Sequence, residues 1–335
     1  MRGLKEEITS IAKEMGIDKV GFTSRERLED APPSGDLGYV LPSARSAISL
    51  CVAFDKTVIR PYLSKQEYWG HIHNHKGSYA KLKGVAKRIQ SLLEDKGCEA
   101  AVPLTNLQWR QGQPFVAMIP PLSHKYVAVA SGIGWLGWSG MVLTPEYGAT
   151  IALLSVVTSA ELEPDPPVEG DFCQNCRLCV AVCPTRFMSE KEEDTVTIAG
   201  RTYTHNKKHP NFRCAVTCGG STGVNAPTAK WSTWSPRVLD FSGCDDDQAF
   251  KQRILEYAED PKHQGVKRLI EATERGGFSS WEEFDLFYNV AFETCGNCML
   301  ICWPEMEDRR ENYRLLTTSG RVMKSETGRV PILRT

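Results

Sequence analysis

Two groups of cysteines have the spacing needed to hold redox-active metal. The first is a C-x2-C-x2-C-x3-C-P run made of Cys173, Cys176, Cys179 and Cys183, followed by Pro184. Bacterial two-cluster ferredoxins use this spacing: three thiolates on a tight loop hold one [4Fe–4S] cubane, and the fourth reaches the other cluster. The second group has C-x2-C-x3-C spacing and is followed by Trp303 and Pro304; it consists of Cys295, Cys298 and Cys302. We therefore expect two [4Fe–4S] clusters and one-electron redox chemistry.

Interleaving of the two groups assigns seven of the eight ligands. The first cluster is expected to take three cysteines of the first group and one of the second: Cys173, Cys176, Cys179 and Cys302. The second cluster then has only three ligands, which are Cys183, Cys295 and Cys298. Cys214 and Cys218 lie between the groups. We favour Cys214 as the eighth ligand and keep Cys218 as the alternative.

Structural zinc and disulfides are the competing explanations for so many cysteines. Zinc sites generally use paired two-cysteine knuckles rather than interleaved triplets with a trailing Cys-Pro, so clusters are favoured. The N-terminal segment Met1 to Glu7 has no apolar core or paired arginines, so we expect a cytoplasmic protein, whose cysteines stay reduced. The remaining cysteines are expected to be simple thiols: Cys51, Cys98 and Cys244.

Composition excludes several kinds of partner. No apolar stretch approaches the roughly 20 residues of a membrane span, so no membrane partner is expected. The formal net charge of -1 gives no overall basic field, which argues against nucleic acid as a partner.

The elements that must position the cysteines alternate between helix and strand signals. Apolar residues at helical spacing predict helices at about 4–15 and 82–93, the latter ending at Gly97. Strands are predicted at 19–23, 47–54 and 150–158. The proline-rich segment 161–167 cannot form regular structure, so we place a domain boundary there. His71, His73 and His75 alternate as on a strand, although a solvated loop is the favoured interpretation.

The residues before the first cysteine group carry a resemblance to a known family. Ser131-Gly132-Ile133-Gly134-Trp135-Leu136-Gly137 leads into Leu143-Thr144-Pro145-Glu146-Tyr147-Gly148, and then into the strand and the proline-rich linker. This order resembles the corrinoid-dependent reductive dehalogenases and their relative, epoxyqueuosine reductase. The opening helix and Val20-Gly21-Phe22-Thr23 resemble the start of the epoxyqueuosine reductases. A G-x-G-x-x-G motif alone is weak, but beside the cysteine motif it is specific.

The resemblance implies an α+β fold in two parts. A nitroreductase-like, cobalamin-binding domain would cover residues 1–165. A ferredoxin-like double-cluster domain would follow at 166–308, with a helical insertion at about 225–290. A polar, partly extended tail would run over 309–335. One cluster would deliver electrons to the cobalt of a corrinoid lying between the two domains.

The resemblance also implies site residues outside the clusters. Catalytic candidates are Tyr79, near the upper corrin face, and Asn106. Backbone at the glycines would approach the corrin closely, because glycine lacks a Cβ; the expected corrin contacts are Gly132, Gly134, Gly137, Trp138, Thr144 and Tyr147. Ordinary turn, helix and core-packing roles are the alternatives for all of these residues.

Departures from the family pattern bear on function. Trp138 occupies the position after the third glycine, where relatives typically have Arg or Lys. Val102 to Asn106 contains no carboxylate of the kind that epoxyqueuosine reductases use, and we find no C-terminal helical-repeat region. tRNA modification is therefore not expected.

Two functions follow from this pattern. We favour a corrinoid-dependent reductase that cleaves a small substrate and receives electrons from a low-potential donor such as ferredoxin or flavodoxin. The alternative is an electron-transfer protein that reduces the corrinoid of a partner protein and has no substrate chemistry of its own. A different cofactor in the same cleft, such as flavin, also remains open.

Overall fold

The protein is described by a computed structural model over residues 2–104, 108–110, 119–218, 222–235, 238–290, 294–323 and 332–333. Its central antiparallel sheet has the strand order β1-β2-β6-β3. These strands are β1 (Lys19–Ser24), β2 (Ser46–Ala53), β6 (Ile151–Thr158) and β3 (Ala100–Ala101). The strands predicted at 19–23, 47–54 and 150–158 are thereby confirmed.

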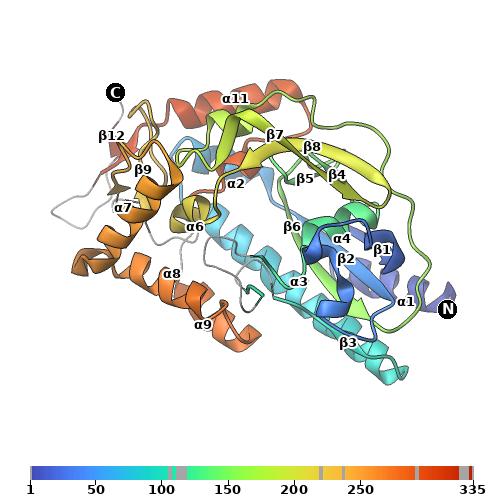
Figure 1. Ribbon diagram of the computed structural model, residues 1–335. Coiled ribbons are helices and arrows are strands. Elements are labelled where there is room, and N and C mark those ends of the chain that lie inside the picture. The colour runs from blue at the N-terminus through green and yellow to red at the C-terminus, as the bar shows by residue number, and fades with distance from the viewer. Residues whose placement is uncertain are drawn as a thin grey trace.

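Both faces of the sheet are covered. Alternate β2 side chains point to opposite faces: Ile48 and Leu50 join the core under α1 and α3, and Ala47 and Cys51 join the core under α4. Figure 1 shows the sheet between α3 and α4. The flanking helices of this half are α1 (Arg2–Glu14), α2 (Lys56–Leu63), α3 (Trp69–Asp95) and α4 (His124–Ala130). This is why β2 is buried along almost its whole length.

Helix α3 is longer than the sequence predicted. It includes His71, His73 and His75, so the strand or loop expected there is wrong. Carboxylate oxygens of Glu67 accept hydrogen bonds from the backbone N–H groups of Trp69 and Gly70, which caps the first turn. The helix ends where predicted, since Gly97 has a φ of +77°.

The cysteine-bearing half contains short helices and a long hairpin (Figure 1). Its strands and helices, including the small β4–β5 pair that precedes it, are β4 (Trp135–Leu136), β5 (Val142–Leu143), α5 (Leu178–Ala181), β7 (Met188–Ile198), β8 (Arg201–Lys208), α6 (Phe212–Cys218), β9 (Gly223–Val224), β10 (Val238–Leu239), α10 (Asn297–Leu300), α11 (Met306–Thr317), β11 (Arg321–Val322) and β12 (Ile332–Leu333). At the hairpin tip, the Asp30 carboxylate accepts hydrogen bonds from Ala199 N and Gly200 N at 3.0 and 2.6 Å. The β7–β8 hairpin is thereby fastened to the N-terminal half.

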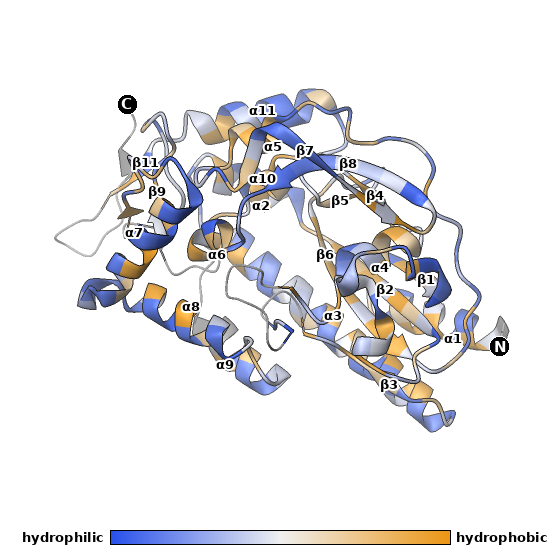
Figure 2. Cartoon of the chain, viewed as in Figure 1, coloured by the Kyte–Doolittle hydropathy of each residue, from blue (hydrophilic) through white to orange (hydrophobic). Residues whose placement is uncertain are grey.

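The segment expected as a helical insertion, at about 225–290, contains three α-helices in its described part. These are α7 (Asp247–Glu259), α8 (Gln264–Glu274) and α9 (Trp281–Val290). Helix α7 packs with α6 through Phe250, Ile254, Phe212 and Val216. Figure 2 shows hydrophobic residues on these helices alternating with hydrophilic ones, as expected for helices that are buried on one side.

One hydrophobic core extends across the expected domain boundary. Residues 161–169 have no regular structure, as predicted. The large core around α3 nevertheless includes Leu300, Ile301, Trp303 and Leu316 from the far end of the chain. Residues 309–317, expected in an extended tail, belong to α11 instead. Among the described residues, no helix has the length and apolar character required to span a membrane.

Candidate metal centre

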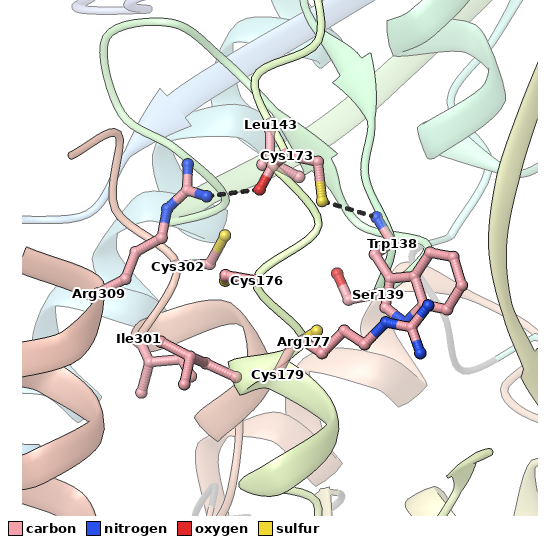
Figure 3. Close-up of a pocket in the computed structure, with 11 residues that line it drawn as sticks. Trp138, Ser139, Leu143, Cys173, Cys176, Arg177, Cys179, Ile301, Cys302 and Arg309 are labelled. Atoms are coloured by element: carbon pink, nitrogen blue, oxygen red, sulfur yellow. Dashed lines mark hydrogen bonds between the residues drawn. The ribbon is translucent and has the colours of Figure 1, made fainter. Parts of the chain in front are cut away.

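The first four expected ligands meet at one cavity. Cys173, Cys176, Cys179 and Cys302 line one shared pocket together with Trp138, Ile301 and Arg309. Figure 3 shows these side chains arranged around it, with Cys302 arriving from a different segment from the other three. Residues far apart in the sequence are therefore brought together as the interleaved scheme predicts.

The backbone of the first loop explains this convergence. Gln174, Asn175 and Arg177, which separate the cysteines, have φ values of 54°, 45° and 59°. Left-handed backbone is uncommon for residues with a Cβ, and it wraps the chain tightly around a common centre. Trp138 N donates a hydrogen bond to Cys173 Sγ at 3.1 Å, as amide groups do to cluster-bound thiolates.

The second set lies beside the first. Burial, followed by the charges of Cys183 and Cys218, raises the pKa of the Cys298 thiol to about 12. Burial and then the charge of Cys218 raise the pKa of Cys295 well above its ordinary value, with smaller contributions from Cys298 and Cys183. Cys183 and Cys218 are therefore close enough to Cys295 and Cys298 for their charges to act on both thiols.

The two cysteines of α6 have different neighbours. The charge of Cys218 acts on both Cys295 and Cys298. Cys214 lies one helical turn earlier, and its charge acts on Lys125. Lys125 is also affected by Cys298, so Cys214 lies near the second set as well, and the choice between Cys214 and Cys218 stays a prediction.

The thiols fit a group that binds as thiolates. All twelve cysteines are free, and burial is the main cause that raises the pKa of Cys173, Cys179 and Cys302, the last to about 12. Thiols buried in this way ionise only when a bound cation compensates the charge, which is what iron supplies. Within the described residues, no three His, Cys, Asp or Glu side chains are placed to share a single metal ion.

Three amines surround the second set. Lys65 interacts with Cys295, Lys125 with Cys298 and Cys214, and Lys208 with Cys298 and Cys179. Burial lowers the pKa of Lys65 to about 7 and that of Lys208 to about 8. Cluster thiolates carry net negative charge, so nearby cations would stabilise them.

The glycine motif packs against the protein's own chain. A Cβ at Gly134 would lie 2.4 Å from Leu143 O, and one at Gly132 would lie 2.3 Å from Pro166 O. A Cβ at Gly137 would lie 2.4 Å from Leu143 Cδ1. These three glycines therefore allow close packing of the β4–β5 pair and the linker, and their expected contact with a corrin stays a prediction.

The other expected corrin contacts also have partners within the chain. Trp138 is buried with Cys179 and Met188, and the Arg177 guanidinium lies 4.5 Å from its ring centroid. Thr144 Oγ1 accepts a hydrogen bond from Tyr147 N at 3.0 Å in the turn before β6. Of the six residues expected at a corrin face, Trp138 lines the first cysteine cavity, and Thr144 and Tyr147 form a turn.

Of the two catalytic candidates, only Tyr79 belongs to the described residues. Tyr79 is half-buried in the middle of α3, with its ring 4.9 Å from that of His75. Asn106 lies outside the described residues. Sequence reasoning also missed Arg309, a buried cation in the first cavity, because its position in a polar C-terminal segment gave no signal.

Sequence comparison finds relatives for about half of the chain. The epoxyqueuosine reductase of Bacillus subtilis (strain 168) is 27% identical over 212 residues, which cover 54% of this chain and 50% of that protein. The resemblance to epoxyqueuosine reductases is confirmed. The chain spans about half the length of the curated relatives that it matches. No model of a protein family matches it.

Solved structures of both branches are similar to the chain. An epoxyqueuosine reductase solved with an epoxyqueuosine-modified tRNA stem loop has a TM-score of 0.45 and 19% identity, covering 95% of this chain and 82% of that one. A reductive dehalogenase described as B12-dependent has a TM-score of 0.47 and 15% identity, covering 80% of this chain and 34% of that one.

Proposed function

We propose that the chain is an iron–sulfur reductase that passes single electrons through two [4Fe–4S] clusters. The observation that carries the proposal is the convergence of two cysteine groups, distant in sequence, on one cavity and one adjacent thiol set. The proposed first cluster is held by Cys173, Cys176, Cys179 and Cys302, and the second by Cys183, Cys218, Cys295 and Cys298. Such clusters supply one-electron transfer, and this chain supplies thiolates, amide donors and buried cations.

A corrinoid is the acceptor that the family resemblance implies, and a ferredoxin or flavodoxin is the proposed donor. The six residues expected at the corrin face have packing roles, so they do not support this cofactor. The support for a corrinoid is therefore the sequence similarity to epoxyqueuosine reductases alone. We propose no catalytic step through it.

The names of the relatives suggest that the first substrate to test is a modified nucleoside within a tRNA. The curated relatives are named epoxyqueuosine reductase, and the structure of one epoxyqueuosine reductase contains an epoxyqueuosine-modified tRNA stem loop. This weighs against the expectation that nucleic acid is not a partner. Reductive cleavage of a small halogenated compound is the second candidate, and reduction of a partner's corrinoid is the third.

Anaerobic reconstitution tests the proposal. Protein incubated with iron and sulfide should hold about eight irons per chain and show broad visible absorption from thiolate-to-iron charge transfer. Adding cobalamin before gel filtration then shows whether a corrinoid co-elutes. Dithionite-reduced protein is assayed on epoxyqueuosine-containing tRNA and on a halogenated phenol. A protein that binds only zinc would contradict the proposal.

A further inference from the structure

Arg309 is a buried guanidinium with no acidic partner. Its side chain is 1% exposed, although it stands near the start of a polar helix. Among the described residues, no carboxylate forms an ion pair with it. Arginine remains protonated in proteins, so its charge must be compensated by something else.

Within the described part of the chain, the side chain of Arg309 donates its hydrogen bonds to backbone carbonyls of the two cysteine segments. Nη1 donates to Cys173 O at 2.7 Å, and Nη2 donates to Phe172 O at 2.8 Å. Nη2 also donates to Pro304 O at 3.0 Å, and Nε donates to Trp303 O. One planar side chain thus joins the segment that begins the first cysteine group to the segment that ends the second.

The charge of Arg309 faces the first cysteine cavity. Arg309 lines that cavity, and its charge acts to lower the pKa of Cys302, which burial raises. Figure 3 shows the guanidinium at the edge of the ring of sulfur atoms, with its hydrogen bond to Cys173 O. The thiols are therefore ionisable groups that share a cavity with this buried cation, whose hydrogen bonds go to neutral carbonyls.

We propose that Arg309 is the counter-ion of the first cluster and sets its reduction potential. This inference depends on the proposed cluster function. Adding one electron to a thiolate-bound [4Fe–4S] cluster increases its negative charge by one. A fixed neighbouring cation stabilises the reduced form more than the oxidised form, so Arg309 raises the potential of the first cluster. Its four carbonyl contacts make it a positioning residue as well.

Substitutions can separate charge from positioning. Arg309→Gln removes both the charge and the planar arrangement of N–H donors. Arg309→Lys keeps the charge but removes that planar arrangement. Arg310→Gln is the matched control, because Arg310 is the next residue of the same helix and is exposed. A charge lost at an exposed position is screened by water and salt.

The measurement is an anaerobic redox titration followed by EPR. The signal of the first cluster is identified as the one that disappears in Cys179→Ser, with dithionite as reductant. Arg309→Gln should lower the potential of that signal and leave that of the second cluster unchanged. Arg309→Lys should remain near the native potential with lower iron occupancy, and Arg310→Gln should change neither potential.

Three outcomes would overturn the inference. The first is a fully loaded Arg309→Gln protein with an unchanged first-cluster potential, and the second is an equal shift of both clusters. The third concerns the case in which Arg309→Gln fails to load its first cluster. The inference is then contradicted if Arg309→Lys contains no more iron than Arg309→Gln. Unmodified protein that holds no iron would instead contradict the proposed cluster function itself.

Discussion

Thiols of one chemical type take different roles here according to what surrounds them. Cys51 is buried in the sheet with its pKa raised mainly by burial, and no other thiol contributes to that shift. Cys298, by contrast, interacts with Cys183, Cys218 and Cys302. A cluster ligand is therefore recognised by its thiol neighbours rather than by its burial.

Replacing each of the two α6 cysteines separately by serine tests which of them is a ligand of the second cluster. Cys218→Ser should remove the second cluster and reduce the iron content from about eight to about four per chain. Cys214→Ser, one turn away on the same helix, is the control and should leave both clusters in place. Iron analysis and EPR of the reconstituted variants provide the measurement. Loss of the cluster in Cys214→Ser alone would return the assignment to Cys214.

Buried His71 should make stability depend on pH. Neither ring nitrogen of His71 has a hydrogen-bond partner among the residues that the structure describes, and burial lowers its pKa from 6.5 to about 4. Between these values the unfolded chain binds the proton and the folded chain does not, so stability falls as pH falls from 6.5 to 4. The loss attributable to His71 between pH 7.5 and 5.5 should be about 1 kcal/mol.

Two phenylalanine variants isolate this effect. His71→Phe should reduce the difference in unfolding free energy between pH 7.5 and 5.5, measured by urea unfolding. His73→Phe is matched to it, because His73 lies on the exposed side of the same helix. Equal pH dependence in both variants and in the unmodified protein would contradict the role of His71.

At the scale of elements, regular hydrophobic patterns were predictable from the sequence and irregular ones were not. β1, β2, β6, α1 and the end of α3 followed from apolar runs and glycine stops. The first turns of α3 were missed because His71, His73 and His75 are spaced two residues apart, which is the period of a strand and not of a helix. β7 was missed because six consecutive residues of this strand are exposed, from Glu190 to Thr195, so it lacks the alternation of a half-buried strand.

The candidate site shows the same limit. The spacing of the cysteines predicted that Cys173, Cys176 and Cys179 lie close together, because two residues between successive cysteines place all three on one tight loop. It could not distinguish Cys214 from Cys218, since both are on one short helix and the choice depends on how α6 packs. The glycine motif was interpreted as a ligand contact, and only the folded chain shows that these glycines also pack closely against Leu143 and Pro166.

Glycine substitutions in two elements should have opposite effects. Gly134→Ala should destabilise the fold by about 1–3 kcal/mol, because the Cβ would lie 2.4 Å from Leu143 O. Gly84→Ala, in the exposed interior of α3 with nothing within 4 Å of the new Cβ, should stabilise it by about 0.5–1 kcal/mol. Urea unfolding of both variants measures the signs. A neutral Gly134→Ala would show that the β4–β5 pair can move apart at little cost.

Across the whole molecule, the two halves share one core and several polar contacts. Arg60 of α2 donates to Asp308 and Asn312 of α11 at 2.5 and 3.0 Å, and its guanidinium lies 4.6 Å from the Trp303 ring centroid. Trp303 is itself in the core under α3. The segment that follows the last expected cluster ligand therefore completes the hydrophobic packing of the N-terminal half.

Residues 1–165 should consequently fail to fold as an independent unit. Without Leu300, Ile301, Trp303 and Leu316, the faces of α2 and α3 that they cover would be exposed to water, at a cost of about 25 cal/mol per Å² of apolar surface. We expect the fragment to bind a hydrophobic dye and to lack a cooperative thermal transition by circular dichroism, whereas the full chain unfolds cooperatively. Co-expression with residues 166–335 is the control, and it should restore the transition. A fragment that unfolds cooperatively alone would show that the expected boundary at 161–167 separates two autonomous domains.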